Sequence, residues 1–188
     1  MLNVYRAGTN PIQRRLWEKL LNAVLFQTVW FVCVLAGDSW ALISVSVFLL
    51  VHWLLITTSR AEWLLIVGVV SSGIIVDSVH IALGVLTVID QTSSSEISLI
   101  PIWLICIWLA FSLTLCHSLS WLQQRLGLAV LLGAVSVPLS YWAGIRLGAM
   151  ELGPQGYLGF VIMAGVWSLL LPTFCFFAAK ASVDGESQ

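Results

Sequence analysis

Charge is what this sequence most lacks. Only 9% of its 188 residues are charged, whereas 60% are apolar, and a soluble domain carries roughly 25% charged residues. So few charges cannot cover a surface that faces water, and lipid must therefore surround most of the chain. The net charge of −1 also leaves no basic surface for a nucleic acid.

The motifs of common soluble enzymes are also missing. The sequence contains no GxSxG, no HExxH, no P-loop and no glycine-rich dinucleotide fingerprint. The loops between the apolar runs are too short to form an active-site domain, so any chemistry would take place within the membrane. Whether the protein is an enzyme stays open, and the missing motifs favour one that is not.

Cysteine is scarce and shows no metal or disulfide pattern. No two cysteines form a CxxC pair, and each lies inside an apolar run. We expect them to act as small apolar packing residues. They are Cys33, Cys106, Cys116 and Cys175.

Long apolar runs are what the sequence has in abundance. A helix needs about 20 apolar residues to cross a hydrocarbon layer of roughly 30 Å. No run alternates like a barrel strand, so helices are the expected spanning form. The sequence predicts an all-α polytopic membrane protein, a bundle of six transmembrane helices that forms one domain over 20–178. The six runs are 20–36, 40–57, 63–88, 99–121, 127–149 and 156–178.

The basic residues predict the orientation of this bundle. Lys and Arg gather on the cytoplasmic side of membrane proteins. With the N-terminus inside, the basic segment 1–19, the short tail 179–188 and all basic residues outside the spans are cytoplasmic. These residues are Arg6, Arg14, Arg15, Lys19, Arg60, Arg125 and Lys180, and the opposite loops hold Asp38, Asp90, Glu96 and Glu151.

An internal repeat is a further hypothesis. An offset of 65 aligns His52 with His117 and gives six identical residues over positions 52–72. The segments 40–88 and 99–149 would then be parallel repeats, which occur in some transporters. Chance matching between two apolar sequences is the alternative.

A first layer of polar residues is predicted near the cytoplasmic side. Gln27, His52 and His117 each lie eight residues from a basic residue that marks this side, which is about 12 Å along a helix. Two histidines at one depth could clamp a haem iron, or each could bind a neighbouring helix or a lipid headgroup. The hydrogen-bonding alternatives are favoured, so no cofactor is expected.

A second layer is predicted in the outer half of the membrane, and it comprises Asp77, His80, Tyr141 and Arg146. Asp77 and His80 are three residues apart and share a helix face. An unpaired charge in lipid costs at least about 2.5–3.5 kcal/mol, so Arg146 is the expected ionic partner of Asp77 and Tyr141 a hydrogen-bond donor. Zinc needs three or four ligands, and one histidine with one aspartate predicts no metal.

This outer layer admits two interpretations. It could be a structural lock that fixes the register of the helices. It could instead be a working site that relays protons or contacts a ligand, in which case Asp77 and His80 are the catalytic candidates.

Small residues four apart predict two places where helices pack closely. Gly144 and Gly148 form one such pair, and Gly68 and Ser72 form the other. Pro138 lies inside the fifth run and predicts a kink there.

Two stretches, FQTVWFVCVLAG at 26–37 and PLSYWAGIRLGA at 138–149, carry a resemblance to a known family. The chain resembles a bacterial inner-membrane family of about this length that is classified only as a domain of unknown function. The resemblance implies a location in the bacterial inner membrane and brings no activity and no catalytic residue.

Three functions remain in view at this point. The favoured one is a carrier or binding protein for an apolar or amphiphilic, lipid-like molecule, whose partners are membrane lipids. The second is a membrane-embedded lipid-modifying enzyme that uses Asp77 and His80, with Arg146 holding a phosphate or carboxylate. The third is a non-catalytic subunit of a homo-oligomer or membrane complex.

Overall fold

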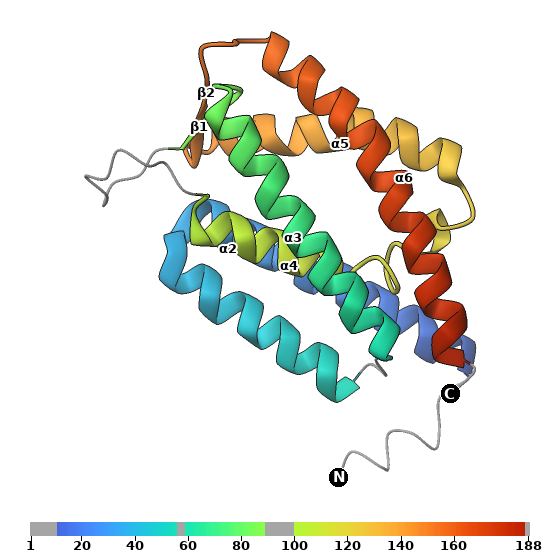
Figure 1. Cartoon of the computed structure of the whole chain (residues 1–188). Helices are drawn as coiled ribbons and strands as arrows, with labels where there is room; N and C mark the ends of the chain where they lie inside the picture. The colour runs from blue at the N-terminus through green and yellow to red at the C-terminus, as the bar shows by residue number, and fades with distance from the viewer. Residues whose placement is uncertain (1–10, 56–58, 89–99, 187–188) are drawn as a thin grey trace.

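Helices make up almost all of the described structure, a computed structural model that covers residues 11–55, 59–88 and 100–186 (Figure 1). The all-α class expected from the sequence is therefore confirmed, with one short strand pair added. The helices are α2 (Pro11–Leu55), α3 (Arg60–Ala82), α4 (Ile102–Ser112), α5 (Leu126–Arg146) and α6 (Leu158–Glu186). A 3₁₀ turn, η1 (Ser120–Leu122), and the strands β1 (Leu86–Val88) and β2 (Met150–Leu152) complete the elements.

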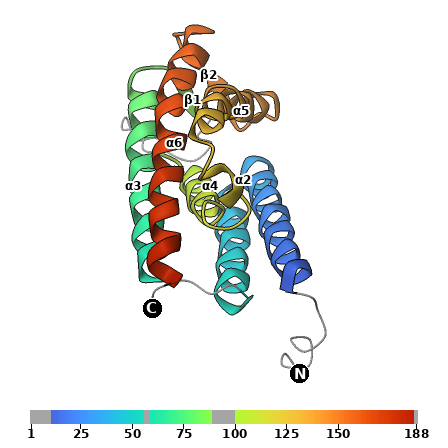
Figure 2. The ribbon, with the colours of Figure 1, turned by 90° about the vertical axis from the view of Figure 1, so that its right-hand side faces the viewer.

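The element α2 consists of two arms joined at Gly37. This residue has φ 74° and ψ −175°, a conformation that glycine adopts without steric cost. The chain turns back at this point, so that the blue and cyan arms lie side by side in both views (Figures 1 and 2). Asp38 follows directly and accepts a 3.0 Å hydrogen bond from the backbone N–H of Trp103. The turn thus fixes the start of α4.

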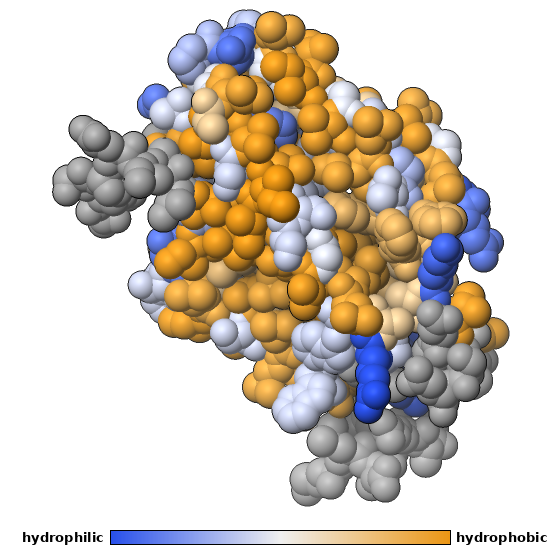
Figure 3. Space-filling model, in the orientation of Figure 1, coloured by the Kyte–Doolittle hydropathy of each residue, from blue (hydrophilic) through white to orange (hydrophobic). Residues whose placement is uncertain are grey.

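Four helices, α2, α3, α5 and α6, are long and apolar enough to cross a membrane, judged by length and composition. Their outward side chains agree with a lipid environment, because large apolar residues such as Leu64 (75% exposed) and Leu169 (71% exposed) lie on the surface. Apolar residues cover most of the face shown in Figure 3. The coarse prediction of a helical membrane protein therefore holds.

The predicted span 99–121 is wrong as a single helix, because α4 ends at Ser112 and turns follow up to η1. The backbone here is bonded in other ways: the Leu119 N–H donates to Thr114 O at 2.9 Å, and Gln123 Nε2 donates to Leu115 O at 2.9 Å. Non-helical backbone at membrane depth is tolerated where protein buries and satisfies it. Leu115 is 1% exposed, which meets that condition.

The helices α3 and α5 end earlier than the predicted spans 63–88 and 127–149, and both end in the same way. Gly84 and Gly148 follow their last turns with φ 67° and φ 82°, the left-handed conformation that commonly stops a helix. The next residues form β1 and β2, which pair antiparallel with Leu86 opposite Leu152. The internal repeat itself stays a prediction.

Two helix pairs make the most extensive contacts, α5 with α6 and α2 with α4. α3 contacts both α4 and α6 and so joins the two pairs. Gly133 permits the approach of α5 to α6, because a Cβ there would collide with the carbonyl oxygen of Trp167. α5 lies across the direction of α3 and α6 and is seen nearly end-on in Figure 2.

Candidate functional site

Asp77 on α3 is the centre of the first polar cluster. It is fully buried, at 0% exposed. The Tyr141 hydroxyl donates to its Oδ1 at 2.6 Å, and the Trp108 indole Nε1–H donates to its Oδ2 at 2.6 Å. His80 Nδ1 lies 3.4 Å from Oδ1, one turn along the same helix. We call these four residues the Asp77 cluster, and it joins α3, α4 and α5.

Gly73 makes room for this cluster. It lies one turn before Asp77 on α3, and a Cβ there would overlap the ring of Trp108. The indole therefore lies directly against the α3 backbone, and on its other side it stacks on Trp167 with centroids 4.8 Å apart and an interplanar angle of 14°. This stack holds the Trp108 N–H in line with the Asp77 carboxylate.

Arg146 lies apart from the Asp77 cluster. It is the last residue of α5, and its side chain is exposed. No ion pair joins it to Asp77 among the residues that the structure describes. α5 ends at Arg146, and Gly148 then turns the chain toward β2, so the arginine does not reach Asp77. Trp108 and His80 contact Asp77 instead.

The two predicted close-packing pairs do not lie at close contacts between helices. Among the described residues, a Cβ at Gly68 or at Gly148 would meet no atom within 4 Å, and at Gly144 it would meet only the Met150 methyl group, at 3.8 Å. Ser72 is partly buried, and its hydroxyl donates back to the Gly68 carbonyl at 2.8 Å. The tight approaches are made at Gly73 and, as described above, on α5 instead.

A cavity of about 670 Å³ lies beside the Asp77 cluster. Its walls come from the first arm of α2, from α4, α5 and α6, and they are mainly aromatic and aliphatic. Asp77 and His80 do not reach the wall; Tyr141 and Trp108 stand between them and the cavity. The polar side chains on the wall include Gln27, Ser136, Ser140 and Tyr141, and the aromatic ones include Trp30, Phe111 and Trp167.

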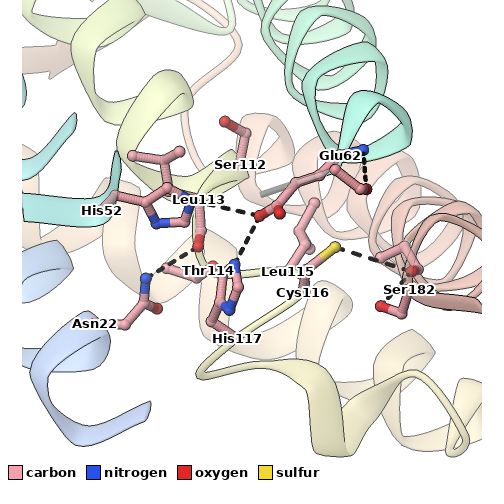
Figure 4. Close-up of polar contacts among 12 residues, drawn as sticks. Asn22, His52, Glu62, Ser112, Leu113, Thr114, Leu115, Cys116, His117 and Ser182 are labelled. Carbon is pink, nitrogen blue, oxygen red and sulfur yellow. Dashed lines mark hydrogen bonds and ion pairs between the residues drawn. The ribbon is translucent and has the colours of Figure 1, made fainter. Parts of the chain in front are cut away.

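A second polar cluster lies where α2 ends and α3 begins (Figure 4). Glu62 Oε1 lies 2.7 Å from His117 Nε2 and 3.4 Å from His52 Nε2. The two imidazole rings meet edge to face with centroids 4.8 Å apart. We call these three residues the His–Glu–His cluster, and all three side chains are of types that bind metal ions.

The chain between α4 and η1 carries His117 into this cluster. Asn22 on the first arm of α2 holds that segment: its Nδ2 donates to Leu113 O at 3.0 Å, and its Oδ1 accepts from the Ser118 hydroxyl at 2.6 Å. Gln27, which was expected beside the two histidines, lies on the cavity wall instead. The polar residue of the first arm that reaches this segment is therefore Asn22.

Sequence reasoning missed Glu62, Asn22 and Trp108. Glu62 follows Ser59 by three residues, the spacing of a helix N-cap, and the Ser59 hydroxyl accepts its backbone N–H at 3.2 Å. This signal fixes the start of α3, and it places the Glu62 side chain at the depth of the nearby histidines. The place of Trp108 deep within an apolar run sets it apart from the tryptophans at the run ends, but the sequence holds no signal for its bond to Asp77.

The comparisons with known proteins place the chain in a family. Residues 19–173 match the family described as "Protein of unknown function (DUF2878)". The chain belongs to that family. The resemblance to a family of unknown function is thereby confirmed. No curated protein and no solved structure matches the chain.

Proposed function

We propose that this protein binds one apolar or amphiphilic, lipid-like molecule in the cavity beside the Asp77 cluster. The observation that carries the proposal is the cavity itself, about 670 Å³ in volume and lined mainly by apolar side chains. Small-molecule sites have volumes of about 300–1,000 Å³, apolar walls and a few placed polar groups. A non-catalytic subunit would need no such space.

The polar groups of the wall suit the head of an amphiphile. Trp167 is 5% exposed, and its indole N–H has no hydrogen-bond partner among the described residues. The N–H faces the Tyr141 hydroxyl oxygen without the geometry of a full hydrogen bond, and that hydroxyl itself donates to Asp77. A buried N–H without a partner costs free energy, and a ligand oxygen at this point would satisfy it. The aromatic walls would take the apolar part of the ligand.

The entrance favours a ligand that arrives from the lipid. Several lining residues are also exposed at the protein surface, among them Phe31 (46%) on α2 and Leu139 (56%) on α5. The cavity thus meets the surface between two apolar helices rather than at a polar loop. An amphiphile could enter with its apolar chain still in contact with lipid.

We also propose the topology and location that the sequence predicts. The two arms of α2, the helices α3 and α6, and α4 with the following turns are taken as separate crossings, and α5 as a sixth that is strongly tilted relative to α3 and α6. The starts of α2 and α3 and the end of α6 lie at one end of the molecule (Figures 1 and 2). This end would be the cytoplasmic side of the bacterial inner membrane, because basic residues gather there.

Two matched glycine variants test the binding proposal. Gly144 lies on the cavity wall of α5 and Gly68 lies on α3 outside the cavity, and a Cβ added at either position would meet no atom within 3.4 Å. Native mass spectrometry of the purified, delipidated protein titrated with oleate should show one bound molecule for the natural protein and for Gly68→Phe. Gly144→Phe should project a ring into the cavity and weaken binding at least tenfold. Equal binding by both variants would refute the proposal.

A further inference from the structure

The His–Glu–His cluster contains a buried imidazole that the protein satisfies only in part. His52 is 0% exposed, and neither of its ring nitrogens has a hydrogen-bond partner among the described residues. Its nearest polar contact is Glu62 Oε1, at the ion-pair distance of 3.4 Å. A buried polar group without a partner costs about 1–3 kcal/mol. A ligand at this point would remove that cost.

The three side chains bring one ligand atom each close together. One donor atom each from His52, Glu62 and His117 lies within 4.8 Å of the other two. Tetrahedral zinc with bonds of about 2.0–2.2 Å places neighbouring ligand atoms roughly 3.3–3.5 Å apart. The distance from His52 Nε2 to Glu62 Oε1 is already 3.4 Å. The 2.7 Å distance from Glu62 to His117 would lengthen by several tenths of an ångström as an ion entered.

The surroundings also suit a metal ion. The side chain of His117 is 18% exposed, whereas those of Glu62 and His52 are 7% and 1% exposed, so the cluster is buried on one side and open at His117. Cys116, the residue before His117, points its Sγ toward Ala178 O on α6 at 3.9 Å, away from the cluster (Figure 4). Two imidazoles and one carboxylate are a known zinc donor set that leaves the fourth position open.

We propose that His52, Glu62 and His117 bind a divalent transition-metal ion, with zinc as the ion that best fits the donor set. The ion would tie together the end of α2, the start of α3 and the irregular segment after α4. This inference does not depend on the proposed lipid binding, because no residue of the cluster lies on the cavity wall. The edge-to-face contact of the two rings leaves no room between them for the porphyrin plane of a haem.

The test measures metal content and stability of the full chain purified in detergent. After removal of metal with EDTA, added Zn²⁺ should bind at one ion per chain by elemental analysis and raise the thermal unfolding midpoint. Glu62→Gln keeps a side chain of the same shape and an oxygen for His117, so it should fold, and it should bind zinc at least tenfold more weakly. His117→Gln should show the same loss. Cys116→Ser is the matched control from the same segment, and it should retain zinc.

Each other outcome contradicts the proposal. A natural protein that binds no zinc above background, with no change in its unfolding midpoint, would overturn it. So would equal zinc binding by Glu62→Gln and the natural protein, since the ion would then lie elsewhere. Loss of zinc in Cys116→Ser would overturn the three-ligand assignment. A haem absorption band in the purified protein would show that the histidines serve a different cofactor.

Discussion

The Asp77 cluster predicts strong coupling between Asp77 and Tyr141. Replacing Asp77 by leucine leaves the Tyr141 hydroxyl and the Trp108 N–H, both now bonded to it at 2.6 Å, without a partner. Each unsatisfied buried donor costs about 1–3 kcal/mol, so Asp77→Leu should destabilise the protein by about 2–6 kcal/mol. Asp77→Asn should cost less, because its amide oxygen can accept from Trp108 while its NH₂ group donates to the hydroxyl.

The decisive quantity is the double-mutant cycle with Tyr141→Phe. In the natural protein, loss of the hydroxyl removes a bond and should cost about 1–2 kcal/mol. In the Asp77→Leu background the same change removes an unsatisfied hydroxyl and should be neutral or stabilising. The expected coupling is therefore at least about 1–2 kcal/mol, which reaches the upper end measured between membrane helices, about 1.7 kcal/mol.

Reversible unfolding in detergent micelles titrated with SDS, followed by far-UV circular dichroism, measures these free energies. Tyr157→Phe is the matched control, because Tyr157 is 83% exposed and should show neither a cost nor a coupling. Independent residues are additive within about 0.3–0.5 kcal/mol. Additivity of Asp77→Leu and Tyr141→Phe within that range would refute the cluster as described.

Two further substitutions test the packing around the clusters. Gly73→Ala should displace the Trp108 ring and cost about 1–3 kcal/mol, as overpacking does, whereas Gly68→Ala should be neutral or gain up to about 1 kcal/mol of helix propensity; equal midpoints of thermal unfolding for the two variants would contradict this. Asn22→Ala should cost about 1–3 kcal/mol and speed amide hydrogen exchange over residues 113–119, while exchange elsewhere in α4 stays slow. Unchanged exchange there would show that other contacts hold the segment.

Hydropathy was sufficient to predict the long helices. It failed to predict where a helix ends when its backbone groups are bonded to side chains of other elements. Residues 113–121 are more polar than those before Ser112, but they contain no glycine or proline that would mark a helix end, so the sequence predicts one helix over 99–121. The helix stops because side chains from elsewhere, Asn22 and Gln123, take up the backbone groups of the segment. Such tertiary bonds leave no local signal in the sequence.

Counting residues along helices gave the correct level for some polar residues and the wrong one for others, such as Gln27, which lies on the cavity wall and not beside the two histidines. Positions along α3 and α5 place Asp77 and Tyr141 at one level, and the structure joins them by a hydrogen bond. Arg146 was expected at the same level, but the end of α5 and the turn at Gly148 leave its side chain exposed. Glu62 was overlooked because it stands beside Arg60 at a span boundary, where a charge is usually solvated.

The measurement that tests the central claim most directly is photo-crosslinking with a diazirine-labelled fatty acid in lipid nanodiscs. Crosslinks mapped by mass spectrometry should include peptides that line the cavity, from residues 26–34 of α2 and 132–144 of α5. Excess oleate should abolish the crosslinks to these cavity peptides. Crosslinks to the exposed face of α3 should persist, because contacts with bulk lipid do not saturate. If oleate left the cavity crosslinks unchanged, or if none formed there, the cavity would not be a ligand site.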